Sequence, residues 1–121
     1  MTRIIVAGSR NFTNKEKLYK TLDTCLEDVD SEVEVVSGHC RGADMLGEQY
    51  AKEHLIPLVI FPADWEKYVK RAGYIRNKQM AEYASKEDGV LIAFPVGESR
   101  GTKMMIRLAH EYGLETTAYE G

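Results

Sequence analysis

The chain has few cysteines, no excess of basic residues and no long apolar segment, and each absence excludes a class of protein. Its two cysteines, Cys25 and Cys40, have neither the spacing of a zinc site nor the number that a disulfide framework needs. No apolar run approaches the ~18 residues of a membrane span. Sixteen basic against nineteen acidic residues give a net charge of −3, whereas domains that bind nucleic acid usually carry a basic excess.

Two common nucleotide-binding motifs are also missing. The first glycine-containing turn, residues 8–12, has one glycine instead of the Gly-x-Gly-x-x-Gly of NAD-binding folds. The second strand-like run ends at Ser37 with no acid to hold a ribose diol, and Gly101-Thr102 lacks the preceding Gly-Lys pattern of a P-loop. The sequence therefore disfavours both the usual dinucleotide fold and a P-loop enzyme.

Nothing in the chain suggests more than one domain. It has 121 residues, a size typical of a single domain, and it contains no repeats, low-complexity tracts or linkers, so we assign residues 1–121 to one unit. The first residues lead directly into a strand-like run at 3–7, which leaves no room for a signal peptide. We therefore expect a soluble, cytoplasmic protein with no membrane partner.

Strand-like apolar runs alternate with helical patterns five times. The expected strands are residues 4–7, 33–36, 57–61, 90–94 and 115–119. Central runs that are apolar on both faces are typical of a parallel sheet covered by helices on each side. The sequence thus predicts an α/β fold, a three-layer Rossmann-like parallel sheet of about five strands, in the order 3-2-1-4-5.

Local signals predict where several helices begin and end. Thr13 and Glu16 have capping-box spacing before the first helix. Asp64 is placed to cap a helix that starts at Trp65, and Gly73 is expected to divide that helix in two. Gly113 is expected to end the last helix.

In this strand order the winding reverses between strands 1 and 4, and ligands bind outside the carboxyl ends of the strands at such a point. The loops brought together there are residues 8–12 and 96–102. The second loop leads into a helix whose free amides and dipole favour an anion, although an ordinary strand-to-helix connection is the alternative.

Arginines gather in loops at the carboxyl ends of the predicted strands, whereas the lysines lie on or beside the helices. Arg10, Arg41 and Arg100 occupy such loops, and Arg71 and Arg76 lie near Gly73. Guanidinium groups grip phosphate or carboxylate in a bidentate manner, so these positions favour an anionic ligand. Structural pairing with carboxylates such as Asp64 and Glu98 is the alternative.

His39, Cys40 and Asp44 share one short loop, but they do not make a convincing metal site or nucleophile pair. No partner group of ligands lies elsewhere in the chain, and residues adjacent in sequence seldom point at each other. We expect a loop histidine that is hydrogen-bonded within the fold, no metal ion and no cofactor.

Several motifs together resemble those of a known family, the small YspA/YpsA-related members of the SLOG superfamily. The resemblance spans nearly the whole chain. In order, the motifs are Gly8-Ser9-Arg10-x-Phe12, Gly38-x-x-Arg41-Gly42-Ala43-Asp44, Phe61-Pro62-Ala63-Asp64-Trp65, Ala72-Gly73-x-x-Arg76-Asn77-x-x-Met80 and Ser99-x-Gly101-Thr102. It implies a Rossmann-like fold related to the DprA and LOG proteins, and a pocket for a nucleotide or nucleotide-derived ligand.

One departure from the LOG pattern bears on catalysis. LOG enzymes cleave nucleoside monophosphates and carry Pro-Gly-Gly-x-Gly-Thr-x-x-Glu. When Gly101-Thr102 is aligned with the Gly-Thr of that motif, Met105 stands where the catalytic glutamate belongs. Because a nearby carboxylate helps form the oxocarbenium-like transition state, its loss should cost orders of magnitude unless another acid substitutes.

The leading hypothesis is a sensor or binding module for a nucleotide-like small molecule. The alternative is a nucleotide-processing enzyme, such as a LOG-like phosphoribohydrolase, with Asp44 or Glu98 as general acid or nucleophile. Single-stranded DNA binding in the DprA manner is disfavoured by the charge, and a homo-oligomer remains open. The candidate ligand-binding residues are Gly8, Ser9, Arg10, Gly38, Arg41, Asp44, Asp64, Arg76, Asn77, Gly97, Ser99, Arg100, Gly101 and Thr102.

Overall fold

Five parallel strands form one sheet in the order β3-β2-β1-β4-β5, which confirms the predicted order. The computed structural model describes residues 1–119. The strands are β1 (Thr2–Gly8), β2 (Val33–Ser37), β3 (Leu58–Ile60), β4 (Asp88–Phe94) and β5 (Glu115–Ala118).

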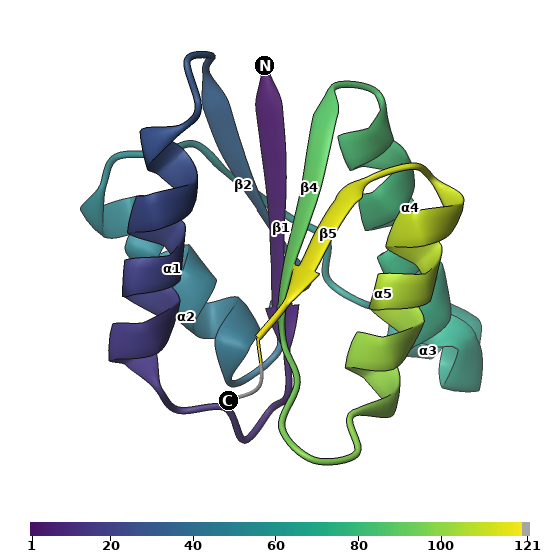
Figure 1. Ribbon diagram of the computed structural model, residues 1–121. Coiled ribbons are helices and arrows are strands. Elements are labelled where there is room, and N and C mark those ends of the chain that lie inside the picture. The colour runs from purple at the N-terminus through teal and green to yellow at the C-terminus, as the bar shows by residue number, and fades with distance from the viewer. Residues whose placement is uncertain (120–121) are drawn as a thin grey trace.

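Helices cover both faces of the sheet, so the predicted three-layer architecture is also confirmed (Figure 1). On one face lie α1 (Lys15–Glu27) and α2 (Ala43–Glu53), and on the other lie α4 (Ala72–Ser85) and α5 (Arg100–Glu111). The short helix α3 (Trp65–Tyr68) and a 3-10 turn, η1 (Val69–Arg71), lead into α4. No helix within residues 1–119 is long and apolar enough to cross a membrane.

The central strands are apolar throughout because both of their faces are buried. Along β1, Ile5 packs into the apolar core under α4 and α5, while Ile4 and Val6 pack into the core under α1 and α2. All three side chains are 0% exposed. This double burial explains why the strand reads as a continuous apolar run instead of an alternating one.

Two of the predicted helix boundaries are wrong. The first helix is capped by Asn14, whose side chain accepts a hydrogen bond from the Lys17 amide at 3.1 Å, and not by Thr13. The break before α4 occurs at Val69, where φ is +51°, and Gly73 lies inside α4. A helix interior tolerates glycine at modest cost, so glycine alone did not locate the break.

The other two boundary predictions are confirmed. The Asp64 side chain caps α3 by accepting a hydrogen bond from the Lys67 amide at 3.0 Å. Gly113 follows the last turn of α5 with φ +74°, the left-handed conformation in which many helices end.

Candidate functional site

β1 and β4 pair side by side up to Gly8 and Phe94, so the loops that follow them leave the sheet at the same edge. Between these loops, α2, α4 and α5 lies a cavity of about 550 Å³, within the size range of small-molecule sites. Its lining comes from segments that are far apart in sequence. These residues are Ala7, Gly8, Ser9, Arg10, Asn11, Cys40, Asp44, Arg76, Asn77, Met80, Val96, Gly97, Glu98, Ser99, Gly101, Thr102 and Met105.

Ser9 joins the two loops that form the mouth of the cavity. Its Oγ accepts a hydrogen bond from the Val96 amide at 2.7 Å and donates to the Val96 carbonyl at 3.3 Å. The Ser9 amide donates to the Phe94 carbonyl at 3.1 Å. Because Ser9 is only 6% exposed, these bonds fix the relative position of the two loops.

The first turn of α5 opens onto the cavity. Ser99 is the N-cap residue, and its Oγ lies 2.5 Å from Thr102 Oγ1. A Cβ on Gly101 would meet nothing within 4 Å, so the space beside its backbone is free for a ligand. The first amides of a helix have no acceptor within the helix, and they attract anions together with the helix dipole.

A buried carboxyl, Asp44, lies on the α2 side of the cavity. It is 5% exposed, and its Oδ2 accepts a hydrogen bond from the Cys40 amide at 3.4 Å. Burial raises the pKa of Asp44 to about 6, against the lowering effects of the Cys40 amide and the Arg76 guanidinium. The cavity therefore holds an acid that titrates near neutral pH.

Arg76 forms the cavity wall next to Asp44 and is held in place by three neighbours. Its Nε donates to Asn77 Oδ1 at 2.8 Å, its Nη1 donates to the Gly38 carbonyl at 2.8 Å, and the same nitrogen lies 3.4 Å from Cys40 Sγ. A Cβ on Gly38 would stand 2.9 Å from Arg76 Nη1 and 3.0 Å from Asp44 Oδ2. The absence of a side chain at Gly38 lets the guanidinium approach the loop.

Most of the predicted ligand-binding residues meet at this cavity. Four do not line it: Gly38 packs behind Arg76, Arg41 and Arg100 are exposed outside it, and Asp64 borders a neighbouring hollow that also touches Arg76. Those that do line it are Gly8, Ser9, Arg10, Asp44, Arg76, Asn77, Gly97, Ser99, Gly101 and Thr102, together with Glu98, the second candidate acid.

The structure adds lining residues that the sequence reasoning did not assign to the ligand. Asn11 and Cys40 lie in loops whose neighbouring residues are predicted to bind the ligand, so their position in these loops could have identified them as lining residues. Met80 and Met105 are each 1% exposed and supply apolar surface. Nothing in the sequence distinguishes them from ordinary core residues of an amphipathic helix.

The side chain of His39 contacts a buried carboxylate of α2, that of Glu48. Its Nδ1 lies 2.8 Å from Glu48 Oε2, and the Ser37 hydroxyl donates to the same oxygen at 2.7 Å. Glu48 is 2% exposed, so this contact provides the carboxylate with a partner. Within residues 1–119, no group of three or more His, Cys, Asp or Glu side chains is placed to hold a metal ion.

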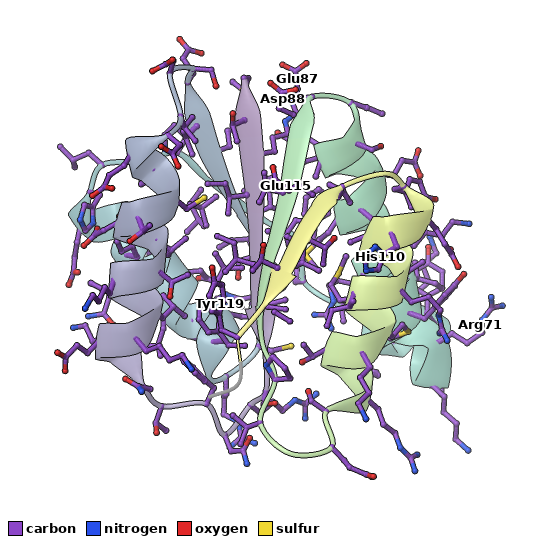
Figure 2. The ribbon with its side chains drawn as sticks, viewed as in Figure 1. Arg71, Glu87, Asp88, His110, Glu115 and Tyr119 are labelled. Carbon is purple, nitrogen blue, oxygen red and sulfur yellow. The ribbon has the colours of Figure 1, made fainter. Side chains whose placement is uncertain are left out.

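The labelled charges in Figure 2 lie away from the cavity. Glu87 and Asp88 lie beside the start of β1, at the opposite end of the sheet from the loops, and Arg71 points outward from the molecule. The cationic side chains among the residues that line the cavity are those of Arg10 and Arg76.

Comparisons with known proteins agree with this architecture. The sequence model of the YspA, cpYpsA-related SLOG family matches residues 2–68. The Gene 61 protein of Mycobacterium phage D29 is 30% identical over 119 residues, which cover 94% of this chain and 93% of the phage protein. Among solved structures, the C-terminal domain of a hydrogenase from Pyrococcus furiosus has a TM-score of 0.52 and 16% identity, over 98% of this chain and 91% of that domain. At that identity the likeness concerns the fold alone.

Proposed function

Because the chain belongs to the YspA, cpYpsA-related SLOG family, we propose that it binds a nucleotide or another phosphoribose-containing ligand in the cavity at the carboxyl ends of β1 and β4, as a sensor or binding module. The observation that carries this proposal is the composition of that one cavity. It combines the open first turn of α5 at Gly101 with the guanidinium groups of Arg10 and Arg76.

The two sides of the cavity suit the two parts of a sugar phosphate. On the α5 side, backbone amides and the helix dipole attract a phosphate, and Arg10 adds a cation at the rim. Opposite it, the carboxyl of Asp44 from α2 and the amide of Asn77 from α4 are each 5% exposed and suit the hydroxyls of a ribose, which need acceptors. A phosphate in the same cavity would raise the pKa of Asp44 further, because like charges oppose its ionisation.

A thermal-shift screen tests the proposal. We expect adenosine monophosphate, other nucleoside monophosphates or ribose 5-phosphate to raise the melting temperature, since a ligand at 100 times its Kd stabilises the folded state by about 2.7 kcal/mol. Arg10→Ala should reduce the shift. Arg41→Ala is the matched control, because this arginine lies outside the cavity. If no nucleotide or sugar phosphate changes the melting temperature, the proposal is wrong.

A second function, hydrolysis of the bound nucleotide, is favoured by Asp44. A carboxyl with a pKa of about 6 is suited to general acid catalysis near neutral pH. The LOG mechanism itself does not transfer, because Met105 supplies apolar surface where the LOG glutamate would stand. In hydrolysis, the oxygen of a water molecule would bond to the sugar carbon as the bond to the base breaks. Asp44 would protonate the leaving base, and the proton that the water loses would restore the Asp44 carboxyl.

Chromatography of the wild-type protein incubated with adenosine monophosphate distinguishes the two functions. Release of adenine and ribose 5-phosphate that Asp44→Asn abolishes would establish the enzyme. Binding without any release of base would leave the sensor or binding module as the function.

A further inference from the structure

Trp65, the single tryptophan of the chain, lies at the first position of α3 and is 53% exposed. An indole carries more apolar surface than most side chains, and leaving it in water forgoes the stabilisation that burial would bring. Such a ring is also a natural stacking surface for a planar partner.

Trp65 does not line the cavity itself, but it lies near Arg76, which does. A Cβ placed on Gly73 would stand 3.7 Å from Trp65 Cη2 and 3.9 Å from Arg76 Nη2. The other terminal nitrogen of Arg76, Nη1, lies 3.4 Å from Cys40 Sγ, which lines the cavity. Arg76 is therefore the partition between the cavity and the tryptophan, and Gly73 leaves the space beside it unfilled.

Hydrogen bonds at both ends fix the backbone of the short helix that carries Trp65. Asp64 caps α3 through the Lys67 amide, and the Val69 amide donates to the Trp65 carbonyl at the other end of the turn. Val69 adopts φ +51°, a conformation that a β-branched residue rarely takes unless its surroundings impose it. The segment is thus a short turn fixed at both ends.

We propose that the ligand of the cavity carries a nucleobase that stacks on Trp65, so that the site selects nucleotides over sugar phosphates that lack a base. The inference rests on the proposed function, because it takes the phosphate and ribose to lie between Arg10 and Asp44. Arg76 then contacts the ligand where the sugar ends and the base begins. The stacking surface tolerates any base, since every base presents a π-face, and purines gain most because they bury more area.

A single-stranded nucleic acid is the competing occupant, since aromatic and basic side chains together are typical of such surfaces. The observations favour the small ligand. Trp65 lies across Gly73 from Arg76, a residue of the cavity wall. Arg71, in the turn that follows α3, points outward from the molecule (Figure 2), and the chain carries a net charge of −3.

Fluorescence titration tests the proposal directly, because tryptophan emission from this protein reports Trp65 alone. We expect adenosine monophosphate to change that emission and to bind about tenfold or more tightly than ribose 5-phosphate, as one stacked base allows. Calorimetry measures the Trp65 variants, because they lack tryptophan. Trp65→Leu should weaken the binding of adenosine monophosphate about tenfold and leave the affinity for ribose 5-phosphate unchanged. Trp65→Phe should restore most of the loss.

Tyr74→Leu is the matched control. It removes another exposed ring, 37% exposed on α4, and should leave both affinities unchanged. Thermal unfolding without ligand checks that Trp65→Leu is folded, which we expect because the ring is exposed.

Three results would overturn the inference, and they differ from one another. Equal affinities for adenosine monophosphate and ribose 5-phosphate, both unaffected by Trp65→Leu, would refute base stacking and leave the proposed function standing. An oligothymidylate that quenches Trp65 where the mononucleotide does not would assign the surface to single-stranded nucleic acid. Failure of both small ligands to bind the wild-type protein would refute the proposed function and this inference together.

Discussion

Because the carboxyl of Asp44 is buried, we expect its ionisation to lower the free energy of unfolding, by an amount that depends on pH. Its pKa is about 6 in the folded protein, and its ordinary value is 3.8. Between these values the folded protein binds a proton that the unfolded chain has released, so this group lowers the free energy of unfolding as the pH rises through 6. The cost is nearly absent at about pH 3 and amounts to about 3 kcal/mol at neutral pH.

Asp44→Asn isolates this effect, because asparagine has nearly the same shape and does not ionise. We expect the free energy of unfolding of the variant, relative to wild type, to rise by about 3 kcal/mol between pH 3 and pH 7.5, with about half of the rise reached by pH 5. For a domain of this size, that rise corresponds to a melting temperature higher by about 10 °C. Urea unfolding of both proteins at four pH values measures the difference.

The value at pH 3 serves as the internal control, since Asp44 is largely protonated there in both the folded and the unfolded chain and the two proteins share every other titrating group. A constant difference across the pH range would show that Asp44 does not titrate as we infer. A wild type that gains on the variant as the pH rises would mean that Arg76 and the Cys40 amide outweigh burial. Either result refutes the reasoning.

Four further substitutions test the framework of the site, each by urea unfolding. Ser9→Ala removes both hydrogen bonds to Val96 and should cost about 1–3 kcal/mol. Gly42→Ala should cost about 3 kcal/mol or more, because at φ +83° its Cβ would stand 2.1 Å from the Ser9 carbonyl oxygen; Gly97→Ala, at φ +59° in open space, should cost less than half as much. Val69→Gly should stabilise the protein by about 1 kcal/mol or less, because glycine adopts the positive φ of this position without the strain that valine has there. A loss of stability would show that the packing of the valine side chain outweighs this strain.

The layout of the sheet was predictable because it follows from local patterns and a few chiral rules. Apolar runs such as residues 90–94 mark strands that are buried on both faces, and right-handed crossovers leave few strand orders. Once strands 1 and 4 are neighbours, the loops after Gly8 and Phe94 must meet. The helix ends at Asp64 and Gly113 were equally predictable, because a helix cap is recognised from its own residue type and its immediate neighbours.

Predictions that depended on loop conformation fared less well. Thr13 and Asn14 are both good cap residues, and which one begins α1 depends on how the loop leaves β1. Gly73 was taken as the break before α4, yet the chain turns at Val69 instead. A tertiary contact decides such cases, since the difference in intrinsic preference between the candidates is small.

The sequence by itself determined that this chain forms a parallel three-layer sheet, that it belongs with the SLOG domains, and that two of its loops share one edge. Those properties depend on periodicity and residue type, which are written along the chain. Only the tertiary structure decided which side chains surround the cavity, why Asp44 titrates near pH 6, and that Trp65 stands beside Arg76 across Gly73. The physical reason is that burial and proximity are set by the packing of α2 on one face of the sheet and of α4, with α3 beside it, on the other, and no local pattern records that packing.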